Sequence, residues 1–209
     1  IVRASVALSE GGADGWTFTN GPEFKGAKGS LETEDGALKL AGDFSGGGAY
    51  VAAVKHLTGY DFKDTTAIRL KYKTANSESL RLQLVDGTGQ AHQTRIKISA
   101  NDQWNDLVID PTKVAGGEHW GGKNDGKWHQ PAKLVSFALN KQSDPAVLPV
   151  VLLKDITLEG SRASVVADAF KSDFTKRDDW NRDGGVLIEG DTLKFSRTEN
   201  EANLPATAF

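Results

Sequence analysis

Residues 67–73 read AIRLKYK, and this stretch decides the fold class. Over its last six residues, apolar side chains at even positions alternate with cations at odd positions. Successive side chains of a β-strand point to opposite faces, so the pattern predicts a strand with one buried face and one solvated face. The same alternation recurs at 80–84, 94–98 and 106–109, and further strands are predicted at residues 37–41, 49–55, 134–139, 147–153 and 155–159.

Turn residues separate these predicted strands. Asp35-Gly36, Gly46-Gly47-Gly48 and Asp144-Pro145 are examples, and the chain holds 23 glycines. Such residues favour the tight backbone paths of turns. No segment keeps a 3.6-residue apolar period over three turns. The sequence therefore predicts an all-β fold, an antiparallel β-sandwich or a barrel.

The bulk composition excludes few classes of function. A formal net charge of −3 over 209 residues gives no argument for nucleic acid. The chain lacks cysteine, which excludes disulfides and thiolate metal sites. It contains no run near the roughly 18 apolar residues that span a bilayer. It starts at Ile1, and we expect a processed product or a part of a longer protein, covalently linked to further domains.

A domain boundary is predicted near Gly160, after the closing strands of a first domain at residues 1–160. Beyond it, elements of the N-terminus recur: RASVA at 3–7 is followed by RASVV at 162–166, and Trp16 with GALKL at 36–40 is matched by Trp180 with GDTLKF at 190–195. This is either a true repeat or two unrelated hairpin openings. We expect residues 161–209 to start a second β domain or to form a β extension docked on the first, because so short a segment hardly folds alone.

The order of several motifs resembles a known family. Gly15-Trp16, GALKL at 36–40, QWNDLVI at 103–109 and LKDITL at 153–158 follow one another as in a carbohydrate-binding module of the galactose-binding-like jelly-roll type, as attached to bacterial polysaccharide-degrading enzymes. The resemblance covers roughly residues 1–160. It implies two packed antiparallel sheets, sugar binding by a concave face or by loops, often a structural calcium ion, usually no catalysis by the module, and a secreted or cell-surface location in a bacterium. It also implies that Trp104 serves core or edge packing and that Trp16 is a structural anchor of the first hairpin.

Residues 118–131, EHWGGKNDGKWHQP, are predicted to form a ligand-binding loop. Proteins hold sugars by stacking aromatic rings on their apolar faces and by hydrogen bonds from planar side chains, and long loops often carry such sites. The alternative is a loop that folds over the sandwich edge, with its tryptophans closing the open end of the core. The candidate ligand residues in this loop are Trp120, Trp128, His119, His129, Asn124, Asp125, Lys123 and Gln130.

A second candidate surface comes from the odd-numbered positions of three predicted strands. They share a face if the strands are neighbours in one sheet. This face would be basic with interspersed amides and would suit an anionic polysaccharide, whose acidic groups pair well with arginine and lysine. The alternative is a solvated face countered by acids from another segment. The residues are Arg69, Lys71, Lys73, Arg81, Gln83, Gln93, Arg95 and Lys97, with Tyr50 as a further candidate on either face and Gln90 and His92 at the turn after Asp86.

A calcium site is a third candidate. Calcium prefers carboxylates and carbonyls from loops, and Asp155, Glu10, Glu32 and Glu34 come from segments that could approach one another. Solvated turn carboxylates are the alternative, and we expect no other cofactor.

Our interpretation is a noncatalytic polysaccharide- or oligosaccharide-binding module of a larger secreted carbohydrate-active protein. Two alternatives stay open: a catalytic jelly roll of the lyase or hydrolase type, in which Asp125 beside His119 and His129 does acid–base work, or a structural spacer of a surface protein.

Overall fold

The structure is a computed structural model that describes residues 2–9, 11–144, 146–162, 186–189 and 192–195. The chain divides into two compact units, residues 1–163 and 164–209.

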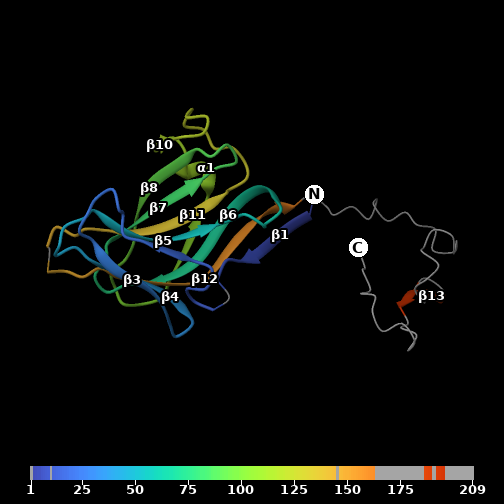
Figure 1. Cartoon of the computed structure of the whole chain (residues 1–209), viewed down its shortest axis with the longest axis horizontal. Coiled ribbons are helices and arrows are strands. Elements are labelled where there is room, and N and C mark those ends of the chain that lie inside the picture. The colour runs from blue at the N-terminus through green and yellow to red at the C-terminus, as the bar shows by residue number, and fades with distance from the viewer. Residues whose placement is uncertain (1, 10, 145, 163–185, 190–191, 196–209) are drawn as a thin grey trace. The chain divides into compact units, whose positions relative to one another are not determined.

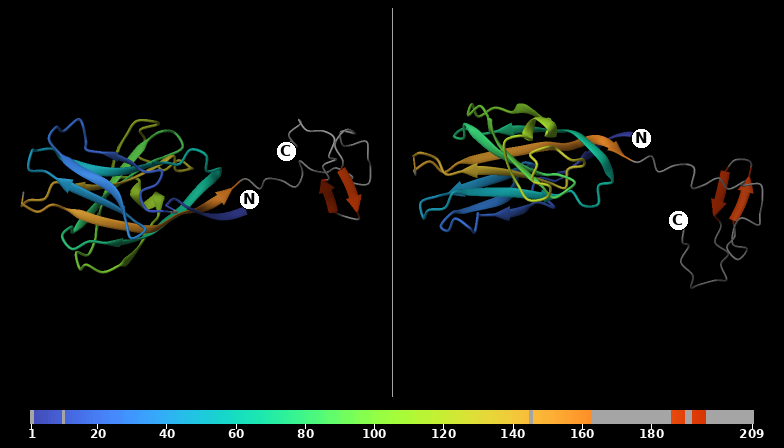
Figure 2. Two further views of the ribbon diagram at one scale, coloured as in Figure 1. Left: turned by 60° about the horizontal axis from the view of Figure 1, so that its bottom comes forward. Right: turned by 90° about the horizontal axis from the view of Figure 1, so that it is seen from above.

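The first unit consists of two six-stranded antiparallel sheets (Figures 1 and 2). This confirms the predicted all-β sandwich. The β12 sheet has the order β3-β4-β12-β6-β9, with β1 paired to β12, and its strands are β1 (Val2–Ala7), β3 (Lys28–Glu34), β4 (Ala37–Asp43), β6 (Phe62–Lys73), β9 (Asn105–Ile109) and β12 (Val150–Arg162). The β7 sheet has the order β10-β8-β7-β11-β5-β2, and its strands are β2 (Thr17–Thr19), β5 (Tyr50–His56), β7 (Ser79–Val85), β8 (Ala91–Lys97), β10 (Glu118–Trp120) and β11 (Leu134–Asn140).

The core lies between the two sheets and follows the alternation seen in the sequence. In β6 the even positions from Ile68 to Tyr72 are buried, and in β7 Leu80, Leu82 and Leu84 are fully buried. Trp16 closes one part of this core: its indole N–H donates to the Leu8 carbonyl at 3.1 Å, and its ring lies 5.8 Å from that of Phe137. Trp16 therefore serves packing, as predicted.

The predicted closing strands at 147–153 and 155–159 are one strand, β12, which corrects the sequence-based division. A bulge interrupts its register between Lys154 and Thr157, and Asp155 has a φ of 52°. Before the bulge the buried residues are at odd positions, such as Leu153, and after it at even positions, such as Ile156. An extra residue in one strand shifts the alternation by one place, which is why the sequence pattern looked like two strands.

The predicted single basic face is also wrong, because its three strands belong to different sheets. β6 lies in the β12 sheet, whereas β7 and β8 lie in the β7 sheet. The segment between β6 and β7 crosses from one layer to the other, and the Thr74 hydroxyl donates to the Val150 carbonyl at 2.7 Å on the way. The cations of β6 form ion pairs with acids of neighbouring segments: Arg69 with Glu159, Lys71 with Asp106 and Lys73 with Asp102.

Trp104 is not a core residue. Its side chain is 39% exposed, just before β9, and the Lys154 ammonium lies 4.1 Å from the centre of its ring.

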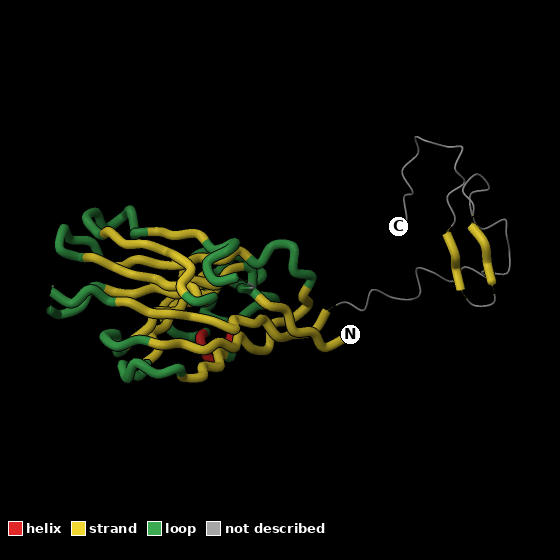
Figure 3. Tube along the Cα trace, turned by 90° about the horizontal axis from the view of Figure 1, so that it is seen from below, coloured by secondary structure: helices red, strands yellow, loops and turns green. Residues whose placement is uncertain are grey.

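Strands and connecting loops make up nearly all of the described residues of this unit, and a single short helix, α1 (Pro111–Val114), follows β9 (Figure 3).

In the second unit the described residues form one antiparallel hairpin of β13 (Val186–Glu189) and β14 (Thr192–Phe195). Trp180 lies outside the described residues, so the repeat stays a prediction. Among the helices of the described chain, none has the length and apolar character required to cross a membrane.

Replacement of Trp16 by alanine should lower the free energy of unfolding by about 3–5 kcal/mol, because it removes a buried ring from the sandwich core. Trp104→Ala is the matched control, and its exposed ring predicts a loss below about 1 kcal/mol. Urea unfolding of both variants measures the difference. Equal losses would show that Trp16 does not anchor the core.

Candidate functional site

The outer face of the β7 sheet, which is the side away from the core, gathers side chains from all six strands. Residues directly opposite each other in antiparallel strands project to the same face. The pairing therefore produces two rows across this face. The first row is Thr19, Ala52, Ala138, Arg81 and Arg95, and the second is Thr17, Val54, Ser136, Gln83, Gln93 and Glu118.

These rows contain a shallow pocket. Its floor consists of the small side chains of Ala52, Ser136 and Ala138, and larger side chains stand around it. The pocket holds about 270 Å³, including space open to solvent. Because the hollow opens to solvent, it suits a ligand that lies on the sheet rather than one that the protein encloses. The remaining lining residues are Thr19, Tyr50, Val54, Arg81 and Gln83.

One wall of the pocket is a stack of Arg81 on Tyr50. The guanidinium carbon of Arg81 lies 3.9 Å from the centre of the Tyr50 ring, and the Tyr50 hydroxyl donates to Glu23 at 2.5 Å. Burial lowers the pKa of Arg81, although nearby Tyr50 and Glu118 oppose this shift. Burial raises the pKa of Tyr50, as does its hydrogen bond to Glu23. Phe24, which is 52% exposed, meets the Tyr50 ring edge-on at 6.4 Å. The result is a flat, fixed surface of one ring and one guanidinium.

Trp120 belongs to the same outer face. It is the last residue of β10, lies opposite Ala91 of β8 and is 43% exposed. Tyr50 lies on β5, which is four strands away from β10. It is also displaced along the strand direction by three positions on the same face. Strand spacing and rise put the two aromatic residues on the order of 25 Å apart. A ligand that contacts both must be a chain of several units.

The loop at 118–131 divides into an exposed part and a packed part. Trp128 is partly buried, packs against the core, and has its ring 5.5 Å from that of His92. This is the alternative considered from the sequence, in which a tryptophan closes the end of the core. Trp120 is the tryptophan of this loop that stays open to solvent.

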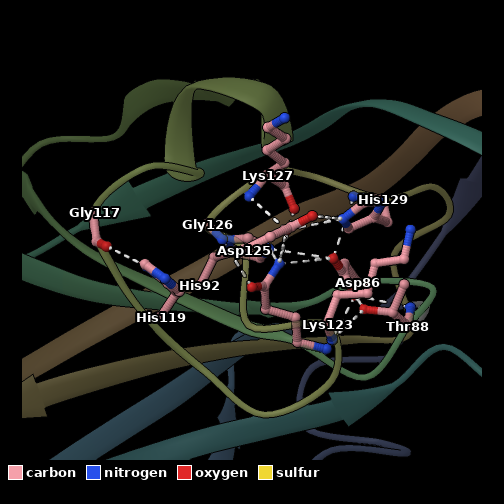
Figure 4. Close-up of polar contacts among 11 residues, drawn as sticks. Asp86, Thr88, His92, Gly117, His119, Lys123, Asp125, Gly126, Lys127 and His129 are labelled. Carbon is pink, nitrogen blue, oxygen red and sulfur yellow. Dashed lines mark hydrogen bonds and ion pairs between the residues drawn. The ribbon is translucent and has the colours of Figure 1, made fainter.

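Gln90 and His92 are fully buried, which corrects the expectation that they reach a ligand. They surround the buried carboxylate of Asp86, which accepts hydrogen bonds from the Thr88 hydroxyl at 2.7 Å, the Gln90 N–H at 3.0 Å and the His129 N–H at 3.2 Å. The Nε2 atom of His92 lies 3.3 Å from the same carboxylate (Figure 4). Asp86 thus ties the loop to the turn between β7 and β8.

The backbone of the loop lies close against that turn. The Gly87 N–H donates to the His129 carbonyl at 2.7 Å, and a Cβ at Gly87 would come within 2.1 Å of the Gln130 carbonyl oxygen. A Cβ at Gly122 would likewise lie 2.3 Å from the Gln90 nitrogen. Side chains at these two positions would separate the loop from the turn. The Gln130 side chain faces β6 instead, where its Oε1 accepts from the Thr65 N–H at 2.7 Å.

The polar residues of the loop tip form a local network. His129 donates from Nε2 to Asp125 at 3.0 Å, whereas His119 donates from Nδ1 to the Gly117 carbonyl at 2.9 Å (Figure 4). Asn124, with a φ of 53°, and Lys123 are exposed. The hydrogen bond from His129 holds the pKa of Asp125 far below its usual range. Asp125 is therefore ionised at neutral pH, and in the enzymatic alternative it would act as a base rather than as a proton donor.

The predicted calcium ligands lie on separate elements. Glu34 forms an ion pair with Lys39, Asp155 occupies the bulge of β12, and Glu10 lies outside the described residues. Across the described ranges, no three His, Asp or Glu side chains gather in a way that could hold a metal ion. The calcium site stays a prediction.

Comparisons with known proteins match the fold. The family 11 carbohydrate-binding module of Clostridium thermocellum, in complex with a β-1,3-1,4-mixed-linked tetrasaccharide, has a TM-score of 0.56 at 16% identity over 77% of this chain and 96% of that chain. The chain shares the fold of carbohydrate-binding modules. The family 11 module of a cellulosomal cellulase of the same organism gives 0.51 at 14% identity over 78% of this chain and 98% of that one. A mutant family 29 module gives 0.49 at 15% identity over 84% and 95%. No family model and no curated protein matches the sequence.

Six residues singled out in the sequence share the outer face of the β7 sheet with Trp120: Tyr50, Arg81, Gln83, Gln93, Arg95 and Lys97. Sequence reasoning missed the pocket floor and the residues that hold Tyr50. The signal that could have found the floor is the run of small residues at alternate positions of β5 and β11, which becomes informative only once their pairing is known. The missed residues are Thr19, Glu23, Phe24, Ala52, Glu118, Ser136 and Ala138.

The buried Asp86 predicts a stability that depends on acid pH. Burial raises the pKa of its carboxyl, but the hydrogen bonds from Thr88, Gln90 and His92 outweigh burial and lower the pKa from 3.8 to about 2. A lowered folded-state pKa stabilises the fold above the unfolded pKa, and this contribution, about 2 kcal/mol, is lost as pH falls from 4 through 2. Asp86→Asn should therefore be less stable at pH 7 and should lose less stability than the wild type between pH 5 and pH 2.

Urea unfolding at several pH values measures this dependence, with the exposed Asp61→Asn as the control for removing one acid. Identical pH profiles for the wild type and Asp86→Asn would contradict the assigned role of Asp86.

Proposed function

We propose that residues 1–163 form a noncatalytic polysaccharide-binding module whose ligand lies across the outer face of the β7 sheet. The observation that carries the proposal is the shallow pocket with its floor of Ala52, Ser136 and Ala138 beside the Tyr50–Arg81 stack. A small-residue floor lets a flat ring approach the sheet closely, and the flat wall fits the edge of a pyranose.

The side chains on this face have the chemistry that sugars require. Pyranose rings offer apolar C–H faces to aromatic rings such as the exposed Trp120. Their hydroxyls pair with planar amides, and Gln83 and Gln93 stand opposite each other in the same row as Ser136. The two ends of the face, marked by Tyr50 and Trp120, are too far apart for one monosaccharide. The ligand is therefore an oligosaccharide or a polymer.

The likeness to a family 11 module solved with a tetrasaccharide supports this proposal through the fold alone. The wider setting remains part of the proposal: a secreted or cell-surface bacterial protein that is active on carbohydrate, in which this module is covalently linked to further domains. A structural calcium ion at Asp155 belongs to the same proposal.

Trp120→Ala should weaken polysaccharide binding about tenfold or more, because an exposed aromatic anchor at an interface contributes around 2 kcal/mol or more. Its melting temperature should stay near that of the wild type, since the ring is 43% exposed. Trp104→Ala is the matched control: it also removes an exposed tryptophan, but on the other sheet, and should bind normally.

Affinity gel electrophoresis against a panel of soluble polysaccharides, followed by calorimetry on the best one, measures both variants. The panel is also assayed for released reducing ends and unsaturated sugars, which a noncatalytic module does not produce. Binding that depends on Trp104 and ignores Trp120 would move the site to the β12 sheet. If no polysaccharide binds, the interpretation that remains is a structural spacer.

A further inference from the structure

Two arginines stand face to face on the outer side of the β7 sheet. Arg81 of β7 is directly opposite Arg95 of β8, and Ala138 of β11 lies on the other side of Arg81. Like charges at directly opposite positions destabilise a sheet. Among the described residues, no carboxylate lies within ion-pair distance of either guanidinium, as every described ion pair involves other residues. Lys97 adds a third cation two residues along the same face of β8.

The β12 sheet shows the opposite arrangement. The cations Arg69, Lys71 and Lys73 of its strand β6 each meet an acid, at 2.7 Å, 2.8 Å and 3.3 Å. On that sheet these cations of β6 form a solvated face, and acids from other segments balance their charge. The same fold therefore pairs these three cations of β6 with acids, whereas the arginines beside the pocket have no carboxylate partner among the described residues.

The acids nearest the pocket are engaged by neutral donors. Glu118, in the row beside the arginines, accepts a hydrogen bond from the Gln93 amide at 2.6 Å. Glu23 accepts from the Tyr50 hydroxyl at 2.5 Å. Both carboxylates attract Arg81 over a longer range, and this attraction reduces the positive potential without occupying its N–H groups.

Arg81 is also held in place before any ligand arrives. Its guanidinium packs on the Tyr50 ring, which the hydrogen bond to Glu23 fixes, and the side chain is half-buried in the pocket wall. A planar guanidinium offers paired N–H donors that match a carboxylate or sulfate group, and a fixed fork loses little entropy on binding.

On these grounds, and resting on the proposed function, we infer that the module takes an anionic polysaccharide, with a carboxylate or sulfate of the sugar bound by Arg81 and Arg95. The acidic group stands over the row of the two arginines, and the sugar ring to which it belongs lies over the small residues of the pocket floor. Gln83 and Trp120 bind the rest of the polysaccharide through uncharged contacts.

The experiment uses polymers matched in backbone and different in charge. Polygalacturonate and alginate are compared with their carboxyl-reduced neutral forms, and a sulfated galactan is compared with its desulfated form, by calorimetry with the 209-residue chain. We expect at least tenfold tighter binding of one charged polymer than of its neutral form. This difference should shrink in 0.5 M salt, because salt screens the attraction between exposed charges.

Substitutions separate a specific contact from general charge attraction. Arg81→Gln and Arg95→Gln should each weaken binding of the charged polymer roughly tenfold to a hundredfold, as expected for hydrogen bonds to a charged group. Arg69→Gln, which removes the same charge from the other sheet, should leave it unchanged. Arg95 is exposed, so its variant remains informative if the loss of the half-buried Arg81 impairs folding.

Each outcome decides between the two proposals. If neutral and charged forms bind equally, and Trp120→Ala abolishes binding while Arg81→Gln does not, the ligand is a neutral polysaccharide: the inference fails and the proposed function stands. If Arg69→Gln weakens binding as much as Arg81→Gln, the attraction is nonspecific and the inference also fails. If no polymer of either kind binds, the proposed function itself is wrong.

Discussion

Side chains directly opposite each other in antiparallel strands share a face, so the register of β5, β11, β7 and β8 determines which residues meet on the outer side of the sheet. A slip by one residue would turn Arg81 and Gln83 into the core and expose the leucines between them. The fully buried leucines of β7 make such a slip costly. The hydrophobic core thus fixes the register, and the register brings Ala52, Ala138 and Arg81 into one row.

A second constraint holds the edge of the same sheet. β10 is only three residues long, and the loop after it continues past the end of β7. The Asp86 carboxylate, buried with hydrogen bonds from Thr88, Gln90 and His129, ties that loop to the β7–β8 turn. A buried carboxylate costs free energy unless it is fully hydrogen-bonded, so the network specifies one position for the loop. Trp128 packs inward beside it, and Trp120 is left on the outer face.

The positions of many strands could be predicted from local alternation, but the sheet to which each strand belongs could not. The period of two located β6, β7 and β9 because each has one buried and one wet face. It missed strands such as β3, whose sequence KGSLETE is polar on both sides because it is an edge strand. It divided β12 at Asp155, where the bulge shifts the phase. It joined Arg69 to Arg81 on one face, because alternation within a strand carries no information about which layer the strand enters.

The cations on the outer faces of the two sheets differ in their partners. This difference distinguishes a candidate binding surface from a face that is merely solvated. Both sheets carry cations at alternate positions, and the sequence alone treats them alike. The structure distinguishes them by their partners: acids of neighbouring strands meet the cations of β6, whereas an aromatic ring and a second arginine meet Arg81. Uncompensated like charges reduce stability, and a sheet without a ligand to bind gains nothing from them. Their position beside a floor of small residues is the observation from which we propose a ligand that supplies negative charge.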